Sequence, residues 1–363
     1  MKVLHLTKVQ GIGGAEQHLL TLLPALRDRG IDARFLSLDA GGDAQRFHDA
    51  LDAHEIPWRR VKSGLDVSPR VGFDVVRALR AERPDLIHTH MVHADAYGSL
   101  AARAQRVPFV STRHNDDRYL LGPFRYVDRT LMLGARRIVA ISDAVRAFHI
   151  RAGLPAGKLE TIHYGLDRAP STPSERSPEE LGIEPGVPLV VAVGRLIAQK
   201  DHATLLTAFK EVHAARPDAR LAVLGWGPLE QELKQRAGAL GIDDAVLITG
   251  RLEPRDWLSR ADVFAHTSRW EGFGLVLLEA MLSSLPVVAT RASAVPEIVA
   301  DGETGLLADI GDARTIAAHL GSLLDDPELR ARLGRAGLER AHTEFSVERM
   351  TTKTINMYER AVG

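Results

Sequence analysis

The chain lacks cysteine altogether, which excludes a disulfide framework and thiolate chemistry. It also lacks any run of about 18 apolar residues, so we expect no transmembrane helix. Residues 1–7 lead directly into a strand-like run, without the apolar core of a signal peptide. These absences predict a cytoplasmic protein, or one that binds peripherally to the inner face of the membrane.

An excess of charge of either sign is also absent, since the formal net charge is −1 over 363 residues. Residues 1–170 nevertheless contain 25 Lys and Arg against 19 Asp and Glu, while the remainder contains 21 against 28. The basic half could face an anionic membrane or acceptor, although ordinary scatter is the simpler interpretation. No nucleic acid is expected as a partner.

Short apolar runs alternate with helical patterns along the whole chain, which indicates parallel sheets covered by helices. Strands are expected at residues 3–7, 33–38, 85–89, 109–112, 137–141, 189–193, 220–224, 246–249, 262–266 and 287–290. Helices are expected at residues 15–29, 73–82, 94–105, 143–152, 202–215, 227–240, 275–285, 312–325 and 346–361. The segment 169–187 is rich in proline and predicts a linker between domains at 1–168 and 188–345.

Two carboxylates, Glu271 and Glu279, lie eight residues apart in the most informative segment of the chain. Glu271 stands among Gly272 and Gly274, and Glu279 lies on the apolar helix that follows. The free amides at a helix start bind anions, and a carboxylate further along can accept hydrogen bonds from sugar hydroxyls. One short segment could therefore hold the phosphate, ribose and sugar of a nucleotide sugar.

Four further segments accompany this E-x7-E pair in a fixed order. They are Gly13-Gly14-Ala15-Glu16, residues 193–201 (VGRLIAQKD), Gly225-Trp226-Gly227-Pro228 and Asp301-Gly302-Glu303-Thr304-Gly305. Together the five segments resemble the retaining GT-B glycosyltransferases of family 4. The resemblance implies an α/β fold of two doubly wound Rossmann-like domains facing across a cleft. It also implies that a last helix, 346–363, crosses back to the first domain.

The resemblance further implies which residues would serve the reaction. The catalytic residues would be His114, Glu271, Arg195 and Lys200. The donor would be held by Gly14, Arg195, Lys200, Gly250, Arg251, Leu252, Glu271, Gly272, Phe273, Gly274, Leu275 and Glu279. The acceptor side would include Gly13, Glu16, His90, His93 and Arg113. Arg195 and Lys200 would neutralise the diphosphate without a metal, because a guanidinium and an ammonium supply the charge.

The glycines after the first strand could instead be a dinucleotide fingerprint. However, Glu16 replaces the third glycine, where the helix packs closely and a pyrophosphate would bind, so this interpretation is weaker. His88 and His90 share one face of a strand and could bind a metal, but a third ligand and a second shell are not evident. We expect no metal and no cofactor.

His114 follows a strand end, the place where open α/β sheets bind their ligands. It resembles the family's histidine near the reaction centre, although Arg113 stands where the family often has a small or aromatic residue. The segment 123–137, with its aromatics and arginines, could touch a membrane surface or could simply be a packed helix with a basic face.

The predicted function is retaining transfer of a hexose-type sugar from a nucleotide diphosphate sugar to an acceptor hydroxyl. A UDP-sugar is favoured as donor, with GDP-mannose as the alternative. The acceptor could be a glycan, a lipid-linked sugar or a small molecule. Two other functions stay open: another GT-B reaction, such as epimerisation, hydrolysis or phosphorolysis, and a non-catalytic subunit that binds sugar nucleotides.

Overall fold

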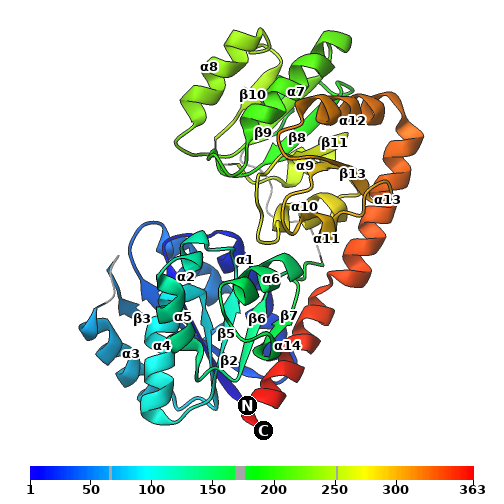
Figure 1. The fold of residues 1–363 in the computed structure, drawn as a ribbon. Coiled ribbons are helices and arrows are strands. Elements are labelled where there is room, and N and C mark those ends of the chain that lie inside the picture. The colour runs from blue at the N-terminus through cyan, green and yellow to red at the C-terminus, as the bar shows by residue number, and fades with distance from the viewer. Residues whose placement is uncertain (65–67, 168–175, 251) are drawn as a thin grey trace. The chain divides into compact units, whose positions relative to one another are not determined.

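The computed structural model describes residues 1–64, 68–167, 176–250 and 252–363 (Figure 1). The chain divides into two compact units, Met1–Gly165 with Ser346–Gly363, and Leu166–Phe345. The predicted base contact Arg251 and residues 169–175 of the predicted linker lie outside the described residues. None of the helices in the described part of the chain combines the length and apolar character needed to cross a bilayer.

The first unit is built on a parallel sheet with strand order β3-β2-β1-β4-β5-β6-β7. Its strands are β1 (Lys2–Val9), β2 (Asp32–Asp39), β3 (Trp58–Lys62), β4 (Leu86–His90), β5 (Phe109–Arg113), β6 (Arg137–Ala140) and β7 (Leu159–Thr161). Its α-helices are α1 (Gly14–Asp28), α2 (Ala44–Ala53), α3 (Pro69–Glu82), α4 (Met91–Gln105), α5 (Phe124–Met132), α6 (Asp143–Arg151) and α14 (Val347–Val362).

Helix α14 is the last element of the chain, yet it packs into the core of this first unit. Ser346 caps its start, because the Ser346 hydroxyl accepts from the backbone N–H of Arg349 at 3.2 Å. Met350, Met357 and Tyr358 follow at helical spacing and are buried against the apolar core around α1 and β1. The first fold unit therefore consists of two segments that are distant in sequence.

The second unit repeats the architecture, with parallel strand order β10-β9-β8-β11-β12-β13. Its strands are β8 (Leu189–Val193), β9 (Arg220–Leu224), β10 (Val246–Ile248), β11 (Val263–His266), β12 (Val287–Thr290) and β13 (Gly305–Ala308). Its α-helices are α7 (His202–Ala215), α8 (Glu230–Leu240), α9 (Arg255–Arg260), α10 (Leu275–Leu282), α11 (Val295–Ile298), α12 (Ala313–Asp325) and α13 (Pro327–Glu344). The continuous apolar run of β8 is typical of a strand buried on both faces.

Both sheets reverse their strand order at one point, between β1 and β4 in the first unit and between β8 and β11 in the second. Doubly wound sheets bind ligands at this switch point, beyond the carboxyl ends of the strands. The predicted fold class of two doubly wound Rossmann-like domains is confirmed. The prediction missed the edge strands β3, β7 and β13, which have short or polar sequences and only one neighbour each.

Candidate active site

The loop after β1 presents two exposed glycines, Gly13 and Gly14, at the start of α1. A side-chain oxygen of Glu16 accepts a hydrogen bond from the Gly13 amide at 3.0 Å, and so closes the first turn of the helix. Burial raises the pKa of the Glu16 carboxyl. The space around Gly14 is open, which leaves its backbone accessible to a ligand.

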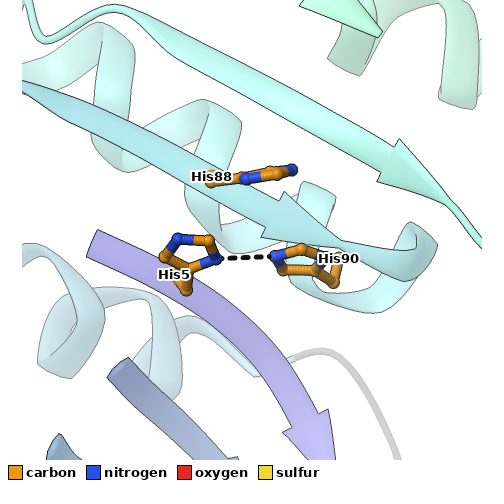
Figure 2. A group of neighbouring side chains, drawn as sticks. All are labelled: His5, His88 and His90. Atoms are coloured by element: carbon orange, nitrogen blue, oxygen red, sulfur yellow. Dashed lines mark hydrogen bonds between the residues drawn. The ribbon is translucent and has the colours of Figure 1, made fainter. Parts of the chain in front are cut away.

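Three histidines gather beneath this switch point (Figure 2). His88 and His90 share a face of β4, as predicted, and their ring centroids are 4.2 Å apart. His5 comes from the neighbouring strand β1, where it pairs in register with His88, and its ring bonds to His90 at 3.0 Å. All three rings are buried, so strand register supplies the third imidazole that sequence reasoning did not find.

His114 directly follows β5 and is only 5% exposed. Its Nε2 forms a hydrogen bond with Nδ1 of His90 at 3.1 Å, and its Nδ1 forms one with the hydroxyl of Tyr164. Burial, and then the nearby Arg113, lower the pKa of His114 to about 3, so the ring is neutral at physiological pH. To form a hydrogen bond with a substrate, His114 would therefore have to give up one of these two bonds.

Tyr164 and His18 complete this part of the first unit, and neither was predicted as a site residue. The ring of Tyr164 stacks on that of His18 at 4.2 Å, and the ring centroids of His18 and His114 are 5.9 Å apart. Nδ1 of His18 is buried without a hydrogen-bond partner in the described part of the chain. His18 lies within the first turns of α1, next to the glycine loop, and so offers a ring nitrogen near the candidate acceptor side.

Arg113 differs from the prediction that placed it on the acceptor side. Its guanidinium is 1% exposed and pairs with Asp128 at 2.8 Å and Asp95 at 3.3 Å. Both carboxylates are buried, so these ion pairs belong to the interior of the unit. His93 lies half-buried on the first turn of α4, where its ring packs edge-on against Tyr97 at 5.8 Å.

In the second unit, Lys200 and Glu271 form a largely buried ion pair. The ammonium of Lys200 donates to a carboxylate oxygen of Glu271 at 2.5 Å, and the two side chains are 14% and 11% exposed. His266 and Ser268 contact the same oxygen at 3.2 Å and 3.3 Å. Burial would raise the pKa of Glu271, but Lys200 and then His266 outweigh it and hold that pKa well below its usual value.

The segment that carries Lys200 is tied to the segment that carries Glu271. The hydroxyl of Thr267 donates to the backbone carbonyls of Lys200 and Asp201, at 3.2 Å and 3.1 Å. The Gln199 side-chain amide donates to the carbonyl of Trp270 at 3.0 Å. These bonds fix the ion pair at the ends of β8 and β11, on the two sides of the switch point.

Arg195 is exposed on the same segment, two residues after the end of β8. The glycines of the Gly225-Trp226-Gly227-Pro228 turn let this segment approach closely. A Cβ atom on Gly225 would lie 1.8 Å from the carbonyl oxygen of Gly194, and one on Gly227 would lie 2.4 Å from that of Leu196. Only glycine fits at both places, so the turn fixes the backbone on either side of Arg195.

Helix α10 starts after Gly274, whose φ of 96° lies in the left-handed region that favours glycine. Phe273 is buried and packs edge-on against Phe345 at 5.9 Å, which supports the loop from behind. The first amides of α10, beginning at Leu275, have no intrahelical acceptor and make this helix start a potential anion site.

Glu279 lies half-buried one turn further along α10. Burial, and then the charge of Glu253, raise the pKa of Glu279 to about 7. Gly250 and Leu252 follow β10; the Gly250 carbonyl accepts from the amide of Gly225 at 2.8 Å, and Leu252 is half-buried. The second unit thus places a cation, a free helix start and two carboxylates of different basicity at one sheet edge.

Comparisons with known proteins identify the family of this chain. The "Glycosyltransferase Family 4" model matches residues 12–169, and the "Glycosyl transferases group 1" model matches residues 173–340. Alpha-maltose-1-phosphate synthase of Mycobacterium tuberculosis is 31% identical, over 83% of this chain and 86% of that protein. The chain belongs to the GT-B glycosyltransferases of group 1 and family 4.

Other relatives match this chain over nearly its full length. The lipopolysaccharide core biosynthesis glycosyltransferase LpsD of Rhizobium meliloti is 28% identical over 100% of this chain and 99% of its own. The crystal structure of Anabaena Alr3699/HepE in complex with UDP and glucose superposes with a TM-score of 0.85, at 26% identity, and covers 99% of both chains. The likeness to a glycosyltransferase that binds UDP therefore extends over nearly the whole chain.

Proposed function

We propose that the protein transfers a hexose-type sugar from a UDP-sugar to an acceptor hydroxyl with retention of anomeric configuration. The buried Lys200–Glu271 pair at the switch point beside α10 carries this proposal. The similar HepE structures in complex with UDP and with UDP-glucose support UDP as the nucleotide of the donor. GDP-mannose is the alternative, because a GDP-mannose-dependent mannosyltransferase of Mycolicibacterium smegmatis is 29% identical.

In this mechanism the second unit holds the donor. Lys200 and the exposed Arg195 bind the diphosphate, together with the first amides of α10, while Glu271 accepts hydrogen bonds from the sugar hydroxyls. The acceptor oxygen bonds to the anomeric carbon as the bond from that carbon to the phosphate oxygen breaks. The acceptor proton passes to the departing phosphate, whose charge the fixed cations stabilise.

A panel of UDP-, GDP-, ADP- and TDP-sugars tests the proposal by thermal shift, because a ligand that binds only the folded state raises its melting temperature. We expect the largest shift with a UDP-sugar. Product analysis by NMR should show a retained anomeric configuration, and turnover should survive EDTA. An inverted product, an epimerised or hydrolysed donor, or turnover that requires added Mn²⁺ or Mg²⁺ would contradict the proposal.

The carboxyl of Glu279 predicts a pH dependence of nucleotide binding. With a pKa of about 7, the group is mostly protonated at pH 6 and mostly ionised at pH 8. If the ionised form accepts hydrogen bonds from the ribose, UDP affinity should rise about tenfold from pH 6 to pH 8. Calorimetry at both pH values measures this change.

Glu279→Gln is the matched control, because it keeps the shape of the side chain but does not titrate. Protonation of the UDP phosphate affects both proteins equally, so only the difference between them reports on Glu279. An identical pH profile for both proteins would show that Glu279 does not bind the ribose through its ionised form. Folding carries the opposite sign: the raised pKa means that stability falls as pH rises from about 4.5 to 7, and the glutamine variant should lose this slope.

The surface formed by Arg118–Leu121, α5 and Leu133 supports a peripheral membrane contact. Phe124, Tyr126 and Leu133 are 63%, 61% and 65% exposed. This surface contains three arginines, Arg118, Arg125 and Arg129, and one acidic residue, the buried Asp128 that pairs with Arg113. Exposed apolar side chains among arginines match an anionic lipid surface, so we propose that this surface binds such a membrane and that the acceptor is lipid-linked.

Flotation with lipid vesicles tests the membrane contact. The protein should bind vesicles that contain phosphatidylglycerol, should bind phosphatidylcholine vesicles only weakly, and should dissociate at high salt. Phe124→Asp should weaken binding about tenfold, since it replaces an exposed aromatic side chain that would insert into the lipid by a negative charge that anionic lipid repels. Ile310→Asp, at a position 44% exposed in the second unit, is the control and should bind normally. Equal binding by both variants would contradict the assignment of the surface.

A further inference from the structure

A continuous chain of hydrogen bonds runs through the interior of the first unit, from Tyr164 beside His114 to Thr112 at its other end. Its links, in order, are Tyr164 Oη to His114 Nδ1, His114 Nε2 to His90 Nδ1 (3.1 Å), His90 Nε2 to His5 Nδ1 (3.0 Å), His5 Nε2 to Tyr358 Oη (3.3 Å), Tyr358 Oη to His88 Nδ1 (2.6 Å) and His88 Nε2 to Thr112 Oγ1 (2.7 Å). Figure 2 shows the central link between His5 and His90, with His88 beside it.

Every group in this chain is neutral. Burial lowers the pKa of His5 to about 3 and holds those of His88 and His90 well below the ordinary value. Burial also raises the pKa of Tyr164 and Tyr358 well above the ordinary value. A neutral imidazole has one N–H donor and one bare nitrogen acceptor, and a hydroxyl has a single hydrogen to donate.

Two arrangements give every link one hydrogen and also use the hydrogen of Tyr358. A third, in which Tyr358 accepts from both His5 and His88, is disfavoured because it leaves the hydrogen of this buried hydroxyl outside the chain. Each link needs one hydrogen, and the chain enters all four imidazoles at Nδ1 and leaves them at Nε2. If Tyr164 donates to His114, then all four histidines carry their hydrogen on Nε2. If Thr112 donates to His88 instead, all four carry it on Nδ1, and the hydroxyl of Tyr164 donates away from His114. The four tautomers are therefore coupled.

Metal binding is the competing explanation for His5, His88 and His90, because one nitrogen of each lies within 4.8 Å of the others. A divalent ion would displace hydrogen bonds that already engage all six ring nitrogens. No carboxylate bonds to these three rings in the described residues, so the orienting and charge-balancing partners of a typical metal histidine are not there. The hydrogen-bond chain accounts for the cluster without an ion.

We propose that this chain is a tautomer relay that fixes which nitrogen of His114 carries the proton, and that Tyr358 is a remote positioning residue. The inference rests on the proposed role of His114 at the acceptor side. Tyr358 lies on α14, 244 residues from His114 in sequence, and connects His5 to His88. Through the relay, the last helix of the chain sets whether Tyr164 donates its hydrogen to His114, or accepts from His114 and donates away from it.

Tyr358→Phe tests the relay, because it removes the hydroxyl that joins two links and keeps the packed ring. Nitrogen-15 NMR of the imidazoles should show one common tautomer for His5, His88, His90 and His114 in the unchanged protein. In the variant the lock should be lost and His114 should populate both tautomers. We expect kcat to fall about tenfold with an unchanged KM for the donor.

Thr354→Val is the matched control, since Thr354 lies on the same helix and its buried hydroxyl bonds only to the carbonyl of Met350 in the described residues. This variant should keep the common tautomer and normal kcat. Thr112→Val cuts the far end of the relay and serves as the second variant if Tyr358→Phe folds poorly. It should disturb the tautomer of His114 in the same way.

Mixed tautomers in the unchanged protein would overturn the proposal, as would a Tyr358→Phe variant that behaves like Thr354→Val. Stoichiometric zinc in the purified protein, with imidazole signals that change on chelation, would replace the relay by a metal site. Normal turnover of a His114→Ala variant would refute the proposed function of His114 instead, while the NMR measurement would still decide on the tautomer lock.

Discussion

Replacing Lys200 by alanine should weaken UDP binding by about 1.5–3 kcal/mol, or roughly 10- to 160-fold, the scale of a charge-assisted hydrogen bond. It should also lower the melting temperature of the free protein. Lys200 is the cationic partner of Glu271, and a buried charge that loses its partner destabilises the fold, by up to about 3 kcal/mol here. Calorimetry with UDP and a thermal melt measure the two effects separately.

A double variant separates binding from folding. Lys200→Ala combined with Glu271→Gln removes both charges, so the melting temperature should largely recover while UDP affinity stays low. Lys210→Ala, at an exposed position on α7, is the control for loss of a lysine and should change neither quantity. Unchanged UDP affinity in Lys200→Ala would show that another group binds the diphosphate.

Replacing His114 by alanine should lower kcat by about 100-fold or more, the scale of a group that acts at the reacting centre. Donor KM should change little, because the proposed diphosphate, ribose and sugar contacts all lie in the second unit. The variant should also melt earlier, since His90 and Tyr164 each lose a hydrogen-bond partner.

The competing view is that His114 only packs the end of β5. It predicts the same lower melting temperature, but normal turnover for each folded molecule. Titration of folded protein with UDP gives the active fraction, and kcat referred to that fraction distinguishes the two views. A normal value would remove His114 from the active site.

The parts of the site that the sequence predicted are those encoded in short contiguous segments. Glu271 and Glu279 are separated by one loop and one helix start, and Lys200 directly follows the end of β8 and its loop. Strand–helix alternation with apolar runs is likewise local, and so it predicted most of both sheets. Arg195 could be placed after a buried strand for the same reason.

The missed features depend on strand register and tertiary contacts. His5 is an ordinary residue of an apolar strand until the pairing of β1 with β4 sets it opposite His88. Tyr164 lies outside the five segments that carry the family resemblance, so the sequence did not mark it as a site residue. The Lys200–Glu271 contact spans 71 residues, and the two were predicted to bind different parts of the donor rather than each other.

Arg113 shows the opposite limitation. The family resemblance placed Arg113 on the acceptor side, together with His90 and His93. However, successive side chains of a strand point to opposite faces of the sheet. Arg113 is therefore directed to buried carboxylates, and only a sequence reading that assigned Asp95 and Asp128 to the same interior could have anticipated this.

The division of the first unit between two distant segments also sets the order in which the protein can fold during its synthesis. Leu166–Phe345 is one uninterrupted stretch, so it can fold as soon as it leaves the ribosome. The first unit is synthesised earlier, but it cannot complete its fold, and it exposes apolar surface until Met350, Met357 and Tyr358 are made and cover it. The half that is translated second should thus be the first to mature, and nascent chains stalled just after Phe345 should bind chaperones through their N-terminal half.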